Sequence, residues 1–147
     1  MISNRIMHEF TQYNQHPVSG INFEMDETNV HKWDGSIIGP TGSPYEGGIF
    51  EISIQFPENY PIDPPSLYFR TQIYHPCVDN EGKFCLPILT NEWNPYNTII
   101  DAMLGVKVML QTVESINDGN AEMVKELKEN KAVFIEKAKK MTKDKAC

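Results

Sequence analysis

The sequence predicts an α+β fold in which the helices are segregated from an antiparallel sheet. Apolar residues recur at helical spacing near both ends of the chain, and at every second position in the stretch between. The 147 residues are 40% hydrophobic and 22% charged, which is typical of a folded domain, and no repeat or low-complexity linker divides them. We therefore expect a single domain over residues 1–147.

The N-terminal residues predict a helix. Apolar side chains recur there at steps of four, four and three, the spacing that places them on one side of a helix. They are Ile2, Ile6, Phe10 and Tyr13. The helix should end near Pro17, because the residue before a proline resists helical torsions.

Residues of alternating polarity come next and predict strands. In the clearest run, residues 50–56, apolar side chains would face the core while the residues between them, including Ser53, would face solvent. Shorter pieces with the same period occur over residues 21–25 and 67–69. Glycine and proline turn signals separate these runs, so a meander of antiparallel strands is expected.

Prolines shape the middle of the chain. Six of the ten prolines lie between Tyr60 and Pro95, and a proline fixes one backbone torsion and donates no backbone hydrogen bond. We expect a shaped loop here, the kind of segment that often holds reactive groups. Trp93 and Tyr96, near its end, would either pack the loop down or anchor a partner.

The C-terminal part returns to helical spacing. Apolar residues trace one helix face between Ile99 and Val113, with Thr98 and Asp101 in capping-box spacing at its start. After a break at residues 118–119, two closing helices are expected.

Charge and hydropathy exclude several classes of protein. Twenty acidic and thirteen basic side chains give a net charge of −7, which disfavours nonspecific binding to nucleic acid or to an anionic membrane. The chain has no apolar run long enough to cross a bilayer and no secretory signal pattern. We therefore expect an intracellular protein.

The cysteines offer a candidate nucleophile. Cys77, Cys85 and Cys147 form no C-x-x-C pair, which favours reduced thiols over a disulfide framework. Cys85 lies in the proline-shaped stretch, where nearby Lys83 would favour a thiolate, although a buried inert cysteine has the same local signature. His75 and Cys77 could form a catalytic pair, or His75 could brace the loop. No fourth ligand at suitable spacing supports a metal site.

At these residues the sequence resembles the active-site signature of ubiquitin-conjugating enzymes. The matching segments are Tyr74-His75-Pro76, Gly82-Lys83-Phe84-Cys85-Leu86 and Trp93-Asn94-Pro95. Supporting matches in the same order are Ser43-Pro44-Tyr45-Glu46-Gly47-Gly48, Tyr60-Pro61 and Pro64-Pro65. The resemblance extends over essentially the whole chain.

This resemblance implies four helices around a four-stranded antiparallel sheet and a carrier role in ubiquitin transfer. An ATP-dependent activating enzyme would pass ubiquitin to the thiol of Cys85 as a thioester. A ligase would then promote transfer to its own cysteine or to a substrate lysine. The family implies no cofactor or metal in the protein itself, a monomer with transient partners, and residence in the cytoplasm and also the nucleus. The alternative is a family-like scaffold that has lost catalysis and only binds ubiquitin or partner enzymes.

The sequence departs from the family pattern at the site. Cys77 stands where the family has an asparagine that either stabilises the oxyanion or braces the loop, and a thiol is a poor hydrogen-bond donor. Pro87 and Asn117 stand where lysine-directed members keep acids, and Asp118 is one position late. We therefore expect that the charged thiol of Cys85 reacts readily with thiols and poorly with free lysine.

The resemblance also assigns partner surfaces. The positions that match the surface offered to activating enzyme and ligase are Arg5, Glu9, Ile62, Pro95 and Tyr96. Asn22 matches a sheet position at which some members bind a second ubiquitin noncovalently. For each of these residues, ordinary surface exposure or packing is the competing interpretation.

Overall fold

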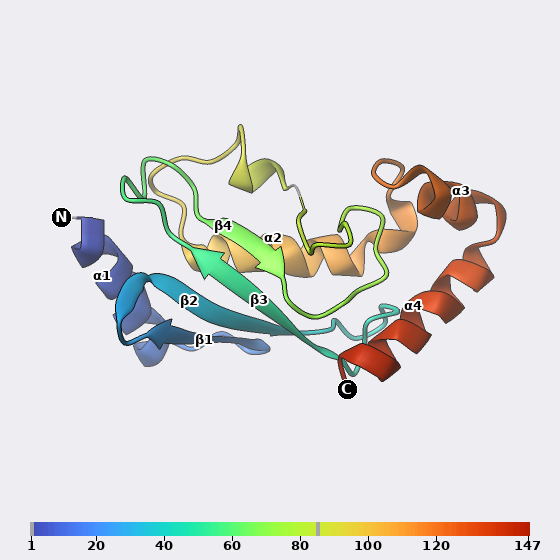
Figure 1. The fold of residues 1–147 in the computed structure, drawn as a ribbon, viewed down its shortest axis with the longest axis horizontal. Helices are drawn as coiled ribbons and strands as arrows, with labels where there is room; N and C mark the ends of the chain where they lie inside the picture. Colours follow the sequence, from blue (N-terminus) through green and yellow to red (C-terminus); the bar gives the residue numbers. More distant parts are fainter. Residues whose placement is uncertain (1, 85) are drawn as a thin grey trace.

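The structure is a computed structural model that describes residues 2–84 and 86–147, apart from the side chains of residues 2 and 3. Its elements in chain order are α1 (Ile2–Gln15), β1 (Ile21–Asp26), β2 (Asn29–Ile38), β3 (Ile49–Gln55), β4 (Ser66–Phe69), a 3₁₀ turn (Pro87–Leu89), α2 (Ile99–Gln111), a second 3₁₀ turn (Val113–Ser115), α3 (Ala121–Glu129) and α4 (Lys131–Lys145). The described part of the chain thus follows the predicted order of helix, strands, long loop and closing helices (Figure 1).

The strands form one antiparallel sheet in the order β1-β2-β3-β4, which confirms the predicted meander. Ser53 on β3 was predicted to face solvent but is only 4% exposed. It pairs with Asp34 on one side and Tyr68 on the other, so larger neighbours on two strands cover this small side chain.

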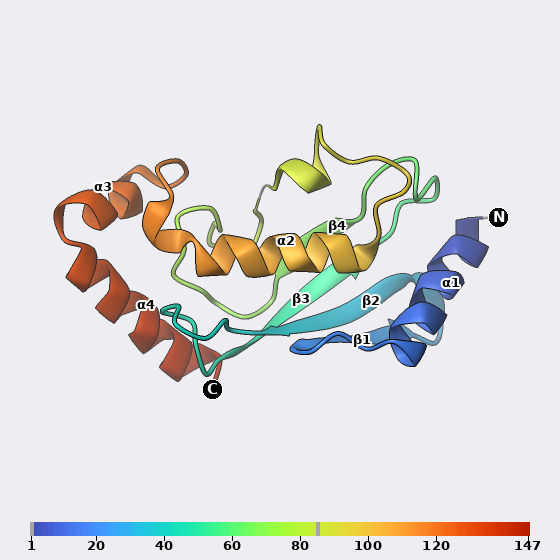
Figure 2. The same cartoon turned by 180° about the vertical axis from the view of Figure 1, so that it is seen from behind.

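The helices take different places around the sheet. α2 runs across one face of it, as the view from behind shows, while α1 lies at one end of the molecule and α3 and α4 lie at the other (Figures 1 and 2). The face of α2 that meets the sheet is apolar. Its buried residues include Ile99, Met103, Val106 and Leu110.

An aromatic cluster anchors α1 to the sheet. Trp33 on β2 is fully buried, and its ring lies edge-on to Phe10 of α1, Phe23 of β1 and Phe56, with centroid distances of 5.2, 5.3 and 4.9 Å. Each such pair contributes about 0.5–1.5 kcal/mol beyond the area it buries. These ring contacts therefore fix α1 against the sheet.

The predicted capping box fixes the start of α2. The Thr98 hydroxyl accepts from the Asp101 amide at 3.2 Å, and the Asp101 carboxylate accepts from the Thr98 amide at 3.0 Å. Both hydrogen bonds satisfy amides that the first turn of a helix leaves unpaired. The segment that enters α2 is thereby held at a defined angle.

Candidate active site

The predicted nucleophile, Cys85, lies outside the described residues, and the structure places the segments on both sides of it. Before it, residues 82–84 lie alongside the edge strand β4, and the Phe69 amide donates to the Gly82 carbonyl at 2.8 Å. Gly82 has a φ of +86°, and a Cβ there would lie 2.0 Å from the Phe69 carbonyl oxygen. Only glycine allows the chain to approach β4 this closely.

After the nucleophile position, Pro87 starts the 3₁₀ turn Pro87–Leu89. The Leu89 amide donates to the Leu86 carbonyl at 2.9 Å and the Thr90 amide donates to the Pro87 carbonyl at 3.1 Å. Proline suits the first position of such a turn because its torsion is already set and its missing N–H is not needed there. Pro87 therefore contributes a turn, and no carboxylate, at this position.

His75 is fully buried and is hydrogen-bonded at both ring nitrogens. Its Nδ1 accepts from the Cys77 amide at 3.0 Å, so Nε2 carries the proton and donates to the Met109 carbonyl of α2 at 3.0 Å. Burial lowers the pKa of this histidine to about 4. A neutral ring with both nitrogens in use braces the loop against α2 and is not available as the base of a catalytic pair.

Cys77 lies half-buried beside the loop that follows α2. Its Sγ is 3.8 Å from the Asp118 carbonyl oxygen, a weak contact at most for a thiol. The backbone next to it is held more firmly, because the Tyr45 hydroxyl donates to the Tyr74 carbonyl at 2.6 Å. The Cys77 side chain thus faces the 117–119 loop.

The 117–119 loop is fixed through the backbone to residues 74–77, the active-site loop. The Asn120 amide donates to the Pro76 carbonyl at 2.8 Å. Gly119 has a φ of +114°, and a Cβ there would lie 2.4 Å from the same carbonyl oxygen. Any larger residue would have to push the two loops apart.

The two polar residues of this loop, Asn117 and Asp118, are both exposed. Asp118 turns its carboxylate to its own chain, where Oδ1 accepts from the Gly119 amide at 2.9 Å. The hypothesis that Asp118 replaces the acid missing at Asn117 requires the loop to move, and the contact between Gly119 and Pro76 opposes that movement.

The predicted partner surface divides into exposed and inward-facing residues. Ile62 and Tyr96 are 69% and 93% exposed, and Pro95 is also exposed. Glu9 is only 5% exposed, so the expectation that it belongs to a binding surface is wrong. The guanidinium of Arg5 is likewise engaged within the chain, as described below.

The remaining predicted residues, Asn22, Trp93 and Tyr96, differ in how far they are packed into the fold. Asn22 lies exposed on β1, and its Oδ1 is 3.4 Å from the Tyr13 hydroxyl. Trp93 packs its loop down, since its indole N–H donates to the Pro61 carbonyl at 2.8 Å. Packing is therefore confirmed for Trp93, while Tyr96 is exposed and its role as an anchor for a partner stays a prediction.

Sequence reasoning missed the residues that hold the site together. One signal was present for Glu9, which stands three residues after Ile6 and four before Tyr13 and so lies on the apolar side of α1. No local pattern marks Tyr60, whose hydroxyl donates to Glu9, 51 residues away along the chain. The same holds for Glu126, which accepts from the Tyr74 hydroxyl, 52 residues away.

Two negative findings apply to the described residues. Within them, no group of three or more histidine, cysteine, aspartate or glutamate side chains is arranged to hold a metal ion. None of the helices found there combines the length and apolar character needed to span a lipid bilayer.

Comparison with known proteins agrees with this geometry. The family described as ubiquitin-conjugating enzyme matches residues 5–142. The chain is 36% identical over 143 residues to ubiquitin-conjugating enzyme E2 T of Xenopus laevis, covering 95% of this chain and 74% of that protein. It is 37% identical over 142 residues to ubiquitin-conjugating enzyme E2 N of Drosophila melanogaster, covering 96% of this chain and 93% of the relative.

Solved structures show the same likeness. The crystal structure of a putative ubiquitin-conjugating enzyme from Plasmodium yoelii superimposes with a TM-score of 0.91 and 36% identity, covering 99% of this chain and 95% of that one. The E2 domain of a Toxoplasma gondii ubiquitin-conjugating enzyme gives a TM-score of 0.89 and 37% identity, with 98% of each chain covered. With its α+β architecture and its braced active-site loop, the chain belongs to the ubiquitin-conjugating enzyme family.

Proposed function

We propose that Cys85 carries ubiquitin as a thioester and passes it preferentially to the cysteine of a ligase. The thiolate of Cys85 attacks the carbonyl carbon of ubiquitin's terminal glycine on the activating enzyme. The bond from that carbon to the activating enzyme's sulfur breaks, and this sulfur leaves as a thiolate. A ligase thiolate then repeats the exchange, and Cys85 leaves as the thiolate. Neither step needs a cofactor on this chain, and ubiquitin-conjugating enzymes use none of their own.

The observation that carries the preference for thiols is the character of three residues, Pro87, Asn117 and Asp118. Pro87 contributes a turn and no carboxylate, and Asn117 is uncharged. The carboxylate of Asp118 already accepts a hydrogen bond from the Gly119 amide. An incoming amine must lose a proton when it attacks, and a nearby carboxylate can accept that proton. A thiol is partly ionised near neutral pH and needs less assistance.

The braced loop supports activity despite Cys77. The contacts of His75 with Met109 and of Pro76 with Asn120 hold the active-site loop without a side-chain amide at position 77. We expect Cys77→Asn to change the rate of transfer to free cysteine by less than about threefold, well below the 10²–10³-fold effect of an oxyanion donor. A rise of about a hundredfold would instead assign the oxyanion role to that position.

The test of the carrier role is a loading reaction. The purified chain is incubated with activating enzyme, ATP and ubiquitin, and a heavier band that thiol reductant removes is expected. Cys85→Ala should abolish the band, while Cys147→Ala, at an exposed position beside the Gly47 carbonyl, should retain it. A band that survives Cys85→Ala would contradict the assignment.

The test of the preference uses the purified thioester. Mixed separately with free cysteine and free lysine at matched concentrations, it should be lost much faster with cysteine. Comparable loss in both would overturn the preference while leaving the carrier role intact.

The broader setting belongs to the same proposal. Membership of the family implies ubiquitin, an activating enzyme and a ligase as partners. The chain acts as a single domain over residues 1–147, as a monomer, in the cytoplasm and the nucleus. Light scattering on the purified protein should give the mass of one chain, 16.8 kDa.

A further inference from the structure

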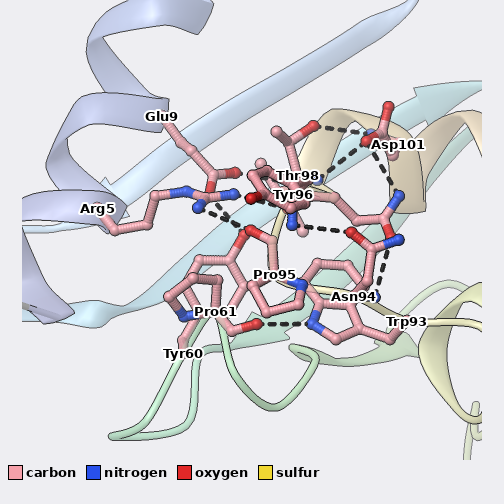
Figure 3. Close-up of polar contacts among 12 residues, drawn as sticks. Arg5, Glu9, Tyr60, Pro61, Trp93, Asn94, Pro95, Tyr96, Thr98 and Asp101 are labelled. Carbon is pink, nitrogen blue, oxygen red and sulfur yellow. Dashed lines mark hydrogen bonds and ion pairs between the residues drawn. The ribbon is translucent and has the colours of Figure 1, made fainter.

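The carboxylate of Glu9 joins separate segments of the chain at the corner where α1 meets the start of α2 (Figure 3). Its Oε2 accepts from the Tyr60 hydroxyl at 2.6 Å and from Arg5 Nε at 2.8 Å. Its Oε1 accepts from the Ile99 amide, the first of α2, at 2.8 Å. A carboxylate buried this deeply is stable only with partners of this kind, so the three segments are held at fixed distances.

The guanidinium of Arg5 extends the same connection. One terminal nitrogen donates to the Pro95 carbonyl at 2.9 Å and the other to the Asn97 carbonyl at 2.7 Å. The guanidinium also lies 5.8 Å from the centre of the Tyr60 ring. Because the planar fork of arginine fixes both direction and distance, it ties the 93–98 loop to α1.

The 60–65 loop and the 93–98 loop also contact each other. The indole of Trp93 donates to the Pro61 carbonyl at 2.8 Å. Within the second loop, the Tyr96 amide donates to the Asn94 side chain at 2.9 Å. Figure 3 shows Arg5 of α1 reaching the Pro95 carbonyl, and the Trp93 indole joined to Pro61 of the other loop.

Each of the two loops carries an exposed apolar side chain. Ile62 is 69% exposed and Tyr96 is 93% exposed, whereas Glu9 and Tyr60, which join the loops to α1, are buried. Two exposed apolar groups on different loops form a preorganised binding surface when their spacing is constant.

We propose that Glu9 is a positioning residue for loading: it sets the spacing of Ile62 and Tyr96 that the activating enzyme contacts. The proposal rests on the carrier role of this chain. In it, Glu9 and Arg5 act through the two loops and touch neither ubiquitin nor the reacting sulfur.

The test is the concentration dependence of loading by activating enzyme. For Glu9→Gln, which keeps the shape but not the charge, we expect the KM for this chain to rise about tenfold, as loss of a charged hydrogen bond implies, with kcat nearly unchanged. Loss of the preformed thioester to free cysteine should proceed at the wild-type rate. Hydrogen exchange should increase in both loops.

Two controls separate positioning from general stability and from direct contact. Ile37→Val removes a buried methylene from β2, away from this corner, and should leave the KM unchanged. Arg5→Gln should raise the KM about as much as Glu9→Gln does. The double variant should raise it no more than either single change, because both residues act through one connection. Additive effects would mean that Arg5 contacts the partner directly.

A wild-type KM in folded Glu9→Gln would overturn the proposal, as would an equal rise in Ile37→Val. If Glu9→Gln does not fold, Tyr60→Phe removes one donor to the same carboxylate and must raise the KM in the same direction. Failure of the wild type to form the thioester would instead overturn the carrier role, a result distinct from normal loading of the variants.

Discussion

Two glutamates at opposite ends of the molecule each hold a tyrosine, in very different surroundings. Glu9 on α1 accepts from the Tyr60 hydroxyl at 2.6 Å, and its side chain is 4% exposed. Glu126 on α3 accepts from the Tyr74 hydroxyl at 2.8 Å, and its side chain is 16% exposed. The first pair underlies the proposed partner surface, and the second lies next to the active-site loop.

The cations that complete the two clusters differ as well. Arg5 binds Glu9 and two backbone carbonyls at once, and 26% of its side chain is exposed. Lys137 of α4 binds Glu126 at 2.7 Å and lies 5.9 Å from the Tyr74 ring, but 54% of its side chain is exposed.

The surroundings decide what each cluster does. Burial, followed by the adjacent Glu9 carboxylate, raises the pKa of Tyr60, so this hydroxyl remains a donor. The hydrogen bond from Lys137 lowers the pKa of Glu126, in a site that water and salt reach. The comparison teaches that a carboxylate, a tyrosine hydroxyl and a cation build a rigid connection when buried and a weak, screened one at the surface.

The largest difference in stability between the two clusters should appear when each glutamate carboxylate is removed. Glu9→Ala leaves the Ile99 amide, the Tyr60 hydroxyl and Arg5 Nε without their acceptor, and should cost about 3–5 kcal/mol of unfolding free energy. Glu126→Ala should cost less than about 1 kcal/mol. Urea unfolding of both variants at pH 7 measures the two losses, and equal losses would break the comparison.

The next effect concerns acid and the active-site loop. His75 has a pKa of about 4 in the folded protein and 6.5 as its ordinary value. The unfolded chain therefore takes up a proton first as the pH falls, so stability from this residue is complete above pH 6.5 and is lost toward pH 4. The loss should approach about 3 kcal/mol.

Urea unfolding between pH 7.5 and 4.5 measures this dependence. The variant His75→Gln, which cannot titrate, should be less stable at neutral pH and should lose less stability on acidification. The same pH dependence in both proteins would show that other groups are responsible.

A smaller loss is expected where the 117–119 loop meets Pro76. Gly119→Ala combines an unfavourable φ with a close approach to backbone, and should cost about 1–3 kcal/mol. Gly42→Ala is the matched control, because its φ is +86° but nothing lies within 4 Å of the added Cβ. Thermal unfolding should place Gly119→Ala clearly below Gly42→Ala, and the reverse order would contradict the close contact.

The smallest effect tests the exposed cluster with salt. Lys137→Met should lower the unfolding free energy only slightly at low ionic strength, and most of that difference should disappear near 1 M salt, where screening acts within about 3 Å. The cost of Glu9→Gln should change little over the same range, because the carboxylate is buried. Urea unfolding at both salt concentrations checks the two expectations.

Much of the fold was predictable because its signals are local. The period-two runs give β1, β3 and β4, the apolar stripe gives α1, and the spacing of Thr98 and Asp101 marks the start of α2. These patterns depend on residues within a few positions of one another. The site segments were likewise marked by their motifs, although Cys85 itself lies outside the described residues.

What the sequence alone determined is the type and order of the elements, the family motifs and the absence of acids at Pro87 and Asn117. Tertiary structure alone decided that Glu9 is buried and that His75 braces the loop, because their partners come from distant segments. The Ile99 amide lies 90 residues beyond Glu9, and the Met109 carbonyl lies 34 beyond His75. Burial and long-range hydrogen bonds exist only after the chain has packed, so no local pattern specifies them.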